Sequence, residues 1–219
     1  MKVSSSMSPL AFTLETNPRR PNFRLARFHA NAIETENGWE YDEYCLEFPT
    51  SDTLEAEIEA HYGEYLKRAM EAEGASEAEY ISVARNAALE RIGGKCSAAI
   101  YSGVTVGGKH YTLSKNQQDA LAIAQSKVDK GATAVIYGGV LTDAATITAL
   151  SQAAYECVVV HTTYDDQLKK YIAVETDTDK LLTIDYGKVL PDSNMQQLAA
   201  LLSSAGIDIT KYTAALTGG

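Results

Sequence analysis

The sequence predicts an α+β fold in which helices dominate, with an N-terminal β-hairpin, long amphipathic helices and short additional hairpins or strands. Three observations predict it. An Asn-Gly pair separates two aromatic-rich runs before residue 50. Apolar residues recur at three- and four-residue steps from Leu54 and again from Ile147. Gly-Gly pairs adjoin short β-branched runs in the middle of the chain.

Residues 1–50 carry strand signals. Residues 23–28 alternate apolar with basic side chains, and Leu46 and Phe48 alternate with Glu47. The Asn37-Gly38 pair between these runs favours a two-residue turn, because both residue types tolerate positive φ. We therefore expect a β-hairpin near residues 23–48, within a docking segment that spans residues 1–50.

Residues 51–102 are expected to be helical. Residues 51–53, Ser-Asp-Thr, offer several N-caps, and two glutamates follow in the first turn. An amphipathic stripe then runs through Leu54, Ile58, Tyr62, Tyr65, Leu66 and Ala69. Gly74 breaks this pattern, and a second helix begins at Ser76 or Glu77. The second helix either ends at the Gly93-Gly94 pair or continues to Ser102.

Residues 103–172 contain both strand and helix signals. A short hairpin is expected to turn on Gly107-Gly108, followed by a helix from Ser114 to about Asp129. Residues 134–137 are typical of a strand. A long helix, capped by Thr142 or Asp143, is then expected to reach Ile172, and the β-branched residues 158–160 favour a kink or break within it.

Residues 173–219 form the fourth region. A polar connector at residues 175–179 precedes a predicted strand at residues 181–184, and a helix is expected to begin after Asp192 or Ser193. We expect residues 213–219 to be frayed. The chain shows no internal repeat.

The composition limits the classes of partner. Apolar residues make up 45% and charged residues 22%, as in a folded globular protein. The net charge of −10 and the absence of a basic cluster argue against nucleic-acid binding. No apolar run reaches membrane-spanning length, and no signal-peptide pattern opens the sequence. Three scattered cysteines, Cys45, Cys96 and Cys157, favour reduced thiols in a protein made inside a cell and not secreted by the standard route.

No pattern in the sequence predicts a catalytic centre. The four histidines, His29, His61, His110 and His161, lie outside any recognised nucleophile motif. Glu57 with His61 and His161 with Asp165 have helical i, i+4 spacing, but neither pair has an evident third metal ligand. The glycine pairs lack the fuller pattern of a phosphate loop. We therefore expect no enzyme activity, no cofactor and no metal.

An aromatic cluster is the best candidate for recognition. It consists of Trp39, Tyr41, Tyr44 and Phe48. Tyrosine and tryptophan supply contact area at low entropic cost and are enriched in interfaces. The alternative is that these side chains form the inner, core-facing side of the hairpin.

Two segments resemble proteins from the tail modules of phages and prophages. Residues 37–44, Asn-Gly-Trp-Glu-Tyr-Asp-Glu-Tyr, resemble a Tyr-Glu-Tyr-Asp-Glu-Tyr-like string near the N-termini of small tail-module proteins of Gram-positive bacteria, with Trp39 in place of the first tyrosine. Residues 87–172 resemble the domain of unknown function found in tail-fibre and tail-fibre-assembly proteins. The matching motifs are Cys-x-Ala-Ile as Cys96-Ser97-Ala98-Ala99-Ile100, Tyr-x-Leu as Tyr111-Thr112-Leu113, a Gln-containing helix at residues 116–119, and His161-Thr162-Thr163-Tyr164.

The resemblance implies a non-enzymatic structural or interaction protein of a phage-like tail. Such a protein would be an accessory tail-fibre, baseplate-peripheral or assembly component, because the chain lacks a repetitive fibre shaft and residues 173–219 have no counterpart in the family. The implied partners are other tail proteins and further copies of the chain, in the host cytoplasm during assembly and then in the virion tail. The alternatives are a receptor- or glycan-binding module, a small host-targeting regulatory protein, and an enzyme such as a cell-wall hydrolase.

Overall fold

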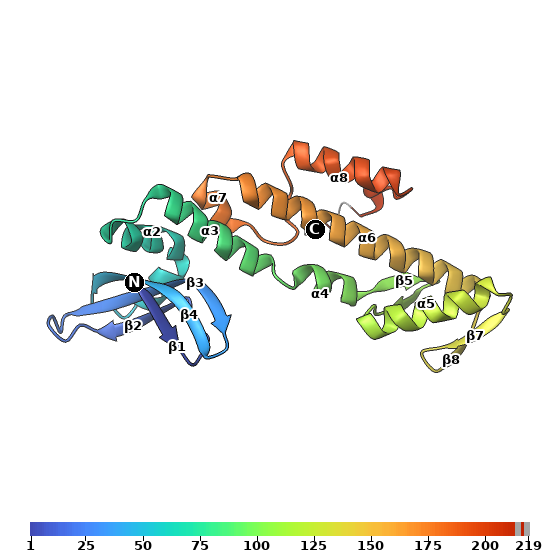
Figure 1. The fold of residues 1–219 in the computed structure, drawn as a ribbon, viewed down its shortest axis with the longest axis horizontal. Coiled ribbons are helices and arrows are strands. Elements are labelled where there is room, and N and C mark those ends of the chain that lie inside the picture. Colours follow the sequence, from blue (N-terminus) through green and yellow to red (C-terminus); the bar gives the residue numbers. More distant parts are fainter. Residues whose placement is uncertain (213–215, 217–219) are drawn as a thin grey trace. The chain divides into compact units, whose positions relative to one another are not determined.

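A computed structural model describes residues 1–212 and 216, and its fold is α+β with helices predominating. The chain divides into two compact units (Figure 1). Unit 1 comprises residues 1–90 and 175–184, and unit 2 comprises residues 91–174 and 185–219. Both units are therefore built from segments that are not contiguous in sequence.

Unit 1 contains a four-stranded antiparallel sheet with the strand order β1-β4-β3-β2. Its strands are β1 (Lys2–Ser5), β2 (Phe12–Thr16), β3 (Phe23–Thr35) and β4 (Gly38–Pro49). The predicted hairpin is confirmed as β3 and β4, which pair from Phe23 with Pro49 to Thr35 with Gly38. Gly38 has a φ of 126°, and a Cβ there would collide with the backbone oxygen of Ser5. This turn therefore requires glycine beside β1.

Helices cover one face of this sheet. They are α1 (Leu54–Ala60), α2 (Tyr62–Ala72) and α3 (Glu77–Ile92). The short α7 (Thr178–Thr183) packs on α2, where Leu182 lies against Gly63. Even-numbered residues of β3, including Ala26 and Phe28, are buried in one cluster with Ile58, Leu66 and Met70 from the helices. The two-residue period of the strand and the three- to four-residue period of the helices thus build a single core.

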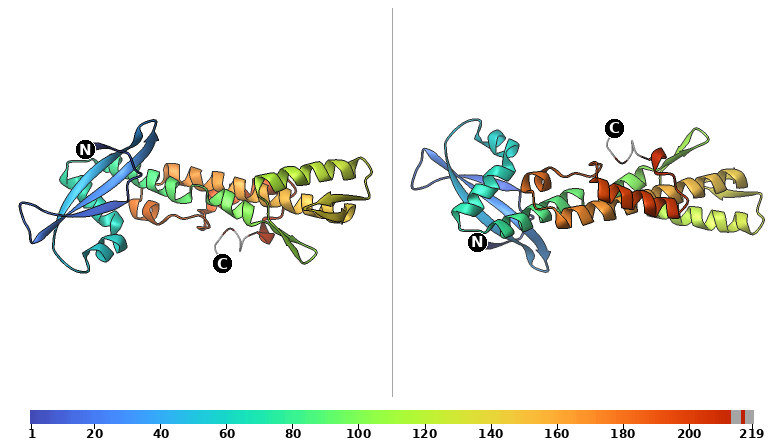
Figure 2. Two further views of the ribbon diagram at one scale, coloured as in Figure 1. Left: turned by 90° about the horizontal axis from the view of Figure 1, so that it is seen from below. Right: turned by 90° about the horizontal axis from the view of Figure 1, so that it is seen from above.

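Unit 2 is organised around the long helix α6 (Ala144–Val174). Helix α5 (Lys115–Asp129) lies along it, as the views in Figures 1 and 2 agree. Two small hairpins complete the core, and further helices pack on α6. These elements are α4 (Lys95–Ser102), β5 (Val104–Val106), β6 (Lys109–Tyr111), β7 (Ala134–Tyr137), β8 (Val140–Asp143), α8 (Asp192–Ser204) and the 3-10 turn η1 (Ile209–Lys211).

Most of the expected elements are confirmed, and three expectations are wrong. Residues 181–184 do not form a strand, because the Asp177 carboxylate accepts the N–H groups of Asp179 and Lys180 and so caps helix α7. The stripe from Leu54 to Ala69 is two helices divided at His61. Residues 158–160 cause no break in α6, where burial of Val160 offsets its lower helix propensity.

The division into units also differs from the four expected regions. The boundary near residue 90 lies inside α3, and residues 175–184 belong with the N-terminal sheet. Between α3 and α4 the chain breaks at Gly93-Gly94, which was one of the two alternatives for this segment. Strands β1, β2 and β8 were not predicted. Of the expected frayed end, residues 213–215 and 217–219 lie outside the described residues.

Candidate interaction site

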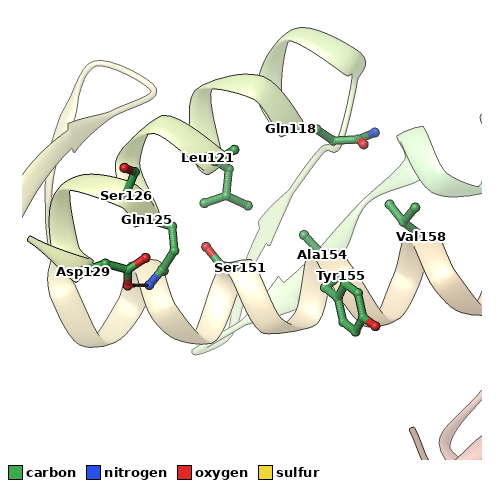
Figure 3. A pocket seen from close by; sticks show the side chains of 10 residues that line it. Gln118, Leu121, Gln125, Ser126, Asp129, Ser151, Ala154, Tyr155 and Val158 are labelled. Carbon is green, nitrogen blue, oxygen red and sulfur yellow. Dashed lines mark hydrogen bonds between the residues drawn. The ribbon is translucent and has the colours of Figure 1, made fainter. Parts of the chain in front are cut away.

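A groove between α5 and α6 is a candidate site in unit 2. Its volume is about 450 Å³, and it is open along one side. Figure 3 shows the side chains that line it, which come from both helices. They are Gln118, Leu121, Ala122, Gln125, Ser126 and Asp129 from α5, and Ser151, Ala154, Tyr155 and Val158 from α6.

The sequence spacing places these side chains on two facing stripes. On both helices the lining positions follow steps of three and one residues, which keep side chains on one side of an α-helix. Capping fixes where each stripe begins. The Ser114 N–H donates to Gln117 Oε1 at 2.9 Å in a capping box, and the Thr146 N–H donates to Asp143 Oδ1 at 2.9 Å.

Small side chains keep the groove open. Leu121 and Ala154 are buried and form its apolar floor, whereas Ala122 is exposed on its wall. The α5 stripe spans eleven residue steps, which corresponds to roughly 16 Å or three helical turns. Small residues allow two helix backbones to approach closely. The dimensions therefore suit a third helix lying along α5 and α6.

Two polar atoms in this groove lack hydrogen-bond partners within the described part of the chain. Gln125 Nε2 donates to Asp129 Oδ1 at 2.7 Å, but Gln125 Oε1 and Ser151 Oγ are buried and unpaired. Buried polar groups usually find partners, and leaving one unpaired costs about 1–3 kcal/mol. A polar side chain that enters the groove could supply these hydrogen bonds after a small rotamer change.

The groove is nearly neutral, although the whole chain has a net charge of −10. Asp129 is its one ionisable side chain apart from the Tyr155 hydroxyl. An uncharged, mostly apolar surface has a small desolvation penalty when another protein covers it. Protein binding is therefore the chemistry that this surface favours.

The β7–β8 hairpin of unit 2 exposes a second apolar surface. Ile136 and Leu141 are directly opposite each other in the hairpin, and they are 76% and 72% exposed. Their neighbour Val140 is 54% exposed. Adjacent exposed aliphatic side chains on a two-stranded sheet are typical of a contact surface.

The structure divides the four aromatic residues that the sequence suggested as one surface. Phe48 is buried and Tyr44 packs on the core of unit 1, under the helices. Trp39 and Tyr41 lie on the opposite face of β4, where the Tyr41 ring contacts His29 at a centroid distance of 4.8 Å. The core alternative therefore describes Tyr44 and Phe48, and an interaction role for Trp39 and Tyr41 stays a prediction.

A charged network on that face of unit 1 was not foreseen. Glu43 is buried and accepts a hydrogen bond from Arg27 Nη1 at 2.5 Å. Arg27 Nε also donates to Glu15 Oε2 at 3.0 Å, and these acids raise the pKa of the guanidinium, the Glu15 bond most of all. His29 Nδ1 lies 2.7 Å from the Leu10 carbonyl oxygen. Because its members bind one another, the network orders the sheet.

Cys96, His161 and Tyr186 come together in unit 2, although 65 residues separate the first two. The Cys96 thiol donates to the His161 carbonyl oxygen at 3.5 Å, and His161 Nδ1 lies 3.1 Å from the Tyr186 hydroxyl. Burial raises the pKa of the Cys96 thiol, whereas a nucleophilic cysteine needs a lowered pKa. The thiol therefore acts as a structural donor in this geometry. Sequence spacing carries no signal for such a distant contact.

The two pairs with metal-ligand spacing, Glu57 with His61 and His161 with Asp165, gain no third ligand among the described residues. Across residues 1–212 and 216, no three histidine, cysteine, aspartate or glutamate side chains converge in a way that could bind a metal ion. Asp165 binds Lys169 Nζ at 2.6 Å, and His161 is buried beside Tyr186. His61 is exposed and lies between α1 and α2.

The described residues include no helix with both the length and the apolar character needed to cross a membrane. Comparisons with known proteins give no family: no protein-family model, no curated protein and no solved structure matches this chain.

Proposed function

We propose that this chain is a non-enzymatic interaction protein and that the α5–α6 groove receives a helical segment of another protein. The groove itself carries this proposal, because it is about three helical turns long, lined in part by small side chains and almost uncharged. Helix-in-groove binding is a common mode of peptide recognition and uses a surface of this kind.

We further propose that the chain is an accessory tail-fibre, baseplate-peripheral or assembly component of a phage-like tail. The support for this context is the resemblance of residues 37–44 and 87–172 to tail-module proteins. The second segment contains both helices of the groove. On this proposal the partners are other tail proteins, and the chain occupies the host cytoplasm during assembly and then the virion tail.

A pair of tryptophan substitutions tests the groove. Ala122→Trp fills it from α5, whereas Ala149→Trp places the same bulk at an exposed position of α6 that does not line it. Each variant replaces the chain in the phage or prophage that encodes it, and mass spectrometry measures its co-purification with tail proteins. We expect Ala122→Trp to reduce co-purification at least about tenfold, a change of about 1.4 kcal/mol, and Ala149→Trp to behave as the original chain.

Three outcomes separate the parts of the proposal. Equal co-purification of both variants would exclude the groove as the binding surface. Loss in both, together with a lower melting temperature, would indicate damage to α5 and α6. Absence of the original chain from purified particles would exclude a virion role, although a role in assembly would survive if the chain still binds tail proteins in lysates.

A further inference from the structure

Strand β2 is an edge strand of the unit 1 sheet, and the hydrogen bonds beside it show which backbone groups face outward. The His29 N–H donates to the Ala11 oxygen at 2.9 Å, and the Asn17 N–H donates to the Phe23 oxygen at 3.1 Å. In an antiparallel ladder such bonded pairs alternate with unbonded pairs. The backbone groups of three β2 residues therefore point away from β3: Phe12, Leu14 and Thr16.

This edge lacks the features that usually prevent strand pairing. It contains no lysine, no proline and no bulge, and its register with β3 is continuous. Its one charged residue, Glu15, is held by Arg27 on the face opposite the helices. The other edge strand, β1, carries Lys2. Of the two edges, β2 is therefore the one open to another strand.

A cleft of about 520 Å³ lies beside β2. Phe12 and Leu14 line it from the strand, and Leu54 lines it from α1. Leu10, also in the lining, is 70% exposed. The rest of the lining is polar or charged and includes Arg24, Asp52 and Glu55. Side chains of an added strand would enter this cleft on the helix-covered side of the sheet and cover its apolar groups.

We propose that β2 is a self-association edge, at which the β2 strand of a second copy adds antiparallel with Leu14 at the twofold axis. In this register Leu14 faces Leu14 of the second copy, and Phe12 faces its Thr16. The outward groups of all three residues then pair, giving about six backbone hydrogen bonds. Symmetry supplies each contact twice.

Charge and polarity favour a second copy as the occupant. On the face opposite the helices, the same register sets Thr13 of one copy against Glu15 of the other, so the two Glu15 side chains are not directly opposed. Like charges directly across a sheet destabilise pairing, and this register does not place them so. Two copies of the segment Phe12-Thr13-Leu14-Glu15-Thr16 can thus pair antiparallel without opposing like charges. This inference concerns unit 1 and does not depend on the groove in unit 2.

Proline substitutions at the two edges test the surface. Thr16→Pro removes an N–H that points outward from β2, at an exposed residue. Ser4→Pro is the matched control in β1, because the Glu43 N–H donates to the Met1 oxygen at 2.7 Å and alternation turns the Ser4 N–H outward. Size-exclusion chromatography with light scattering on the full chain should give twice 23.7 kDa for the original chain and for Ser4→Pro, and 23.7 kDa for Thr16→Pro.

Disulfide trapping tests the register. Thr13→Cys and Glu15→Cys are made in separate full-length chains, since these two positions face each other only between copies. Mild oxidation of the mixed chains should yield a covalent dimer, and oxidation of either variant alone or of the original chain should yield much less. If circular dichroism shows that Thr16→Pro is unfolded, the cross-linking result alone tests whether β2 is the self-association edge.

Several results would overturn the proposal. A monomeric original chain at all concentrations would do so, as would a dimer that Thr16→Pro leaves intact. Equal loss of the dimer in Thr16→Pro and Ser4→Pro would assign association to both edges and contradict the selectivity of β2. Cross-linking in the single variants as strong as in the mixture would exclude the register centred on Leu14.

Discussion

At the scale of single residues, the side chains of His161, Tyr164 and Tyr186 hold the segment after α7 against α6. The Tyr186 hydroxyl donates to the His161 carbonyl oxygen at 3.3 Å, so its oxygen is left to accept from His161 Nδ1. The Tyr164 hydroxyl donates to the Lys188 oxygen at 2.7 Å and accepts the Gly187 N–H at 3.0 Å. Each polar group of this cluster therefore has a defined function in the fold.

His161 makes the stability of the protein depend on pH. Burial lowers its pKa below the ordinary value of 6.5, so the unfolded chain takes up a proton first as the pH falls. The neutral His161 side chain therefore makes its full contribution to the free energy of unfolding above about pH 6.5. Below that pH the free energy of unfolding decreases by at most about 1.4 kcal/mol per pH unit for one proton. We expect His161→Asn to lose less free energy of unfolding between pH 8 and pH 5 than the original chain does, as measured by urea denaturation.

The exposed His110 supplies the control for this comparison. His110→Asn should retain the pH dependence of the original chain. If His161→Asn also retains it, the buried imidazole is not the group that titrates.

Tyr164→Phe should destabilise the protein by about 1–3 kcal/mol, because it leaves the Lys188 oxygen and the Gly187 N–H without their partner. The hydroxyl is buried, and burial raises the pKa of Tyr164 to about 12. Urea denaturation measures the effect, and Tyr101→Phe, at a 43% exposed residue, should change the free energy of unfolding by less than about 0.5 kcal/mol. Equal effects of the two substitutions would contradict this assignment.

At the scale of secondary structure, elements with a strong local signal were predictable. Asn37-Gly38 predicted the turn between β3 and β4, and Ser114 predicted the start of α5. Strand β2 is only five residues long and lacks a two-residue hairpin turn, and it forms because β3 supplies its partner. Residues 181–184 were predicted as a strand because a short apolar run fits either period, and the Asp177 cap decides for helix.

The junction between α4 and the β5–β6 hairpin depends on Gly103. Its φ is 95°, and a Cβ there would collide with the Tyr111 oxygen and lie 2.7 Å from Thr112 Cα. Gly103→Ala should therefore lower stability by more than about 3 kcal/mol, since backbone strain and a clash act together. Gly107→Ala is the control, with a milder left-handed backbone at φ 57° and open space around the added methyl group. Thermal unfolding should separate the two variants clearly, and similar melting temperatures would contradict the clash.

At the scale of the whole molecule, unit 1 is completed by residues 175–184, which follow the first segment of unit 2 in sequence. Leu182 of α7 packs on the core of unit 1, and Arg85 Nη2 donates to the Glu175 oxygen at 2.8 Å. Sequence patterns could not predict this arrangement, because periodicity reports which face of an element is buried and not which partner covers it. The sequence predicted the helices α5 and α6. It did not predict the groove between them, because periodicity does not show that these two helices pack side by side.

Leu181→Ala should destabilise unit 1 although the residue lies far from the sheet in sequence. Its side chain is fully buried, and truncating a buried leucine costs about 2–5 kcal/mol. Hydrogen exchange should show reduced protection of the β3 and β4 amides. Val189→Ala, at a residue that is 64% exposed, should leave the protection of these strands unchanged. Unchanged protection in Leu181→Ala would show that α7 is not needed for the sheet.

The discontinuity of unit 1 also determines when it can be finished during synthesis. Its strands and its first three helices leave the ribosome first, and α7 follows about ninety residues after α3. At translation rates of roughly 5–20 residues per second, that delay is about 5–20 s. Throughout this interval, the surface of α2 around Gly63 that Leu182 later covers is bare. The nascent chain thus exposes an apolar surface that is buried in the complete protein, and chaperones can bind this surface during synthesis.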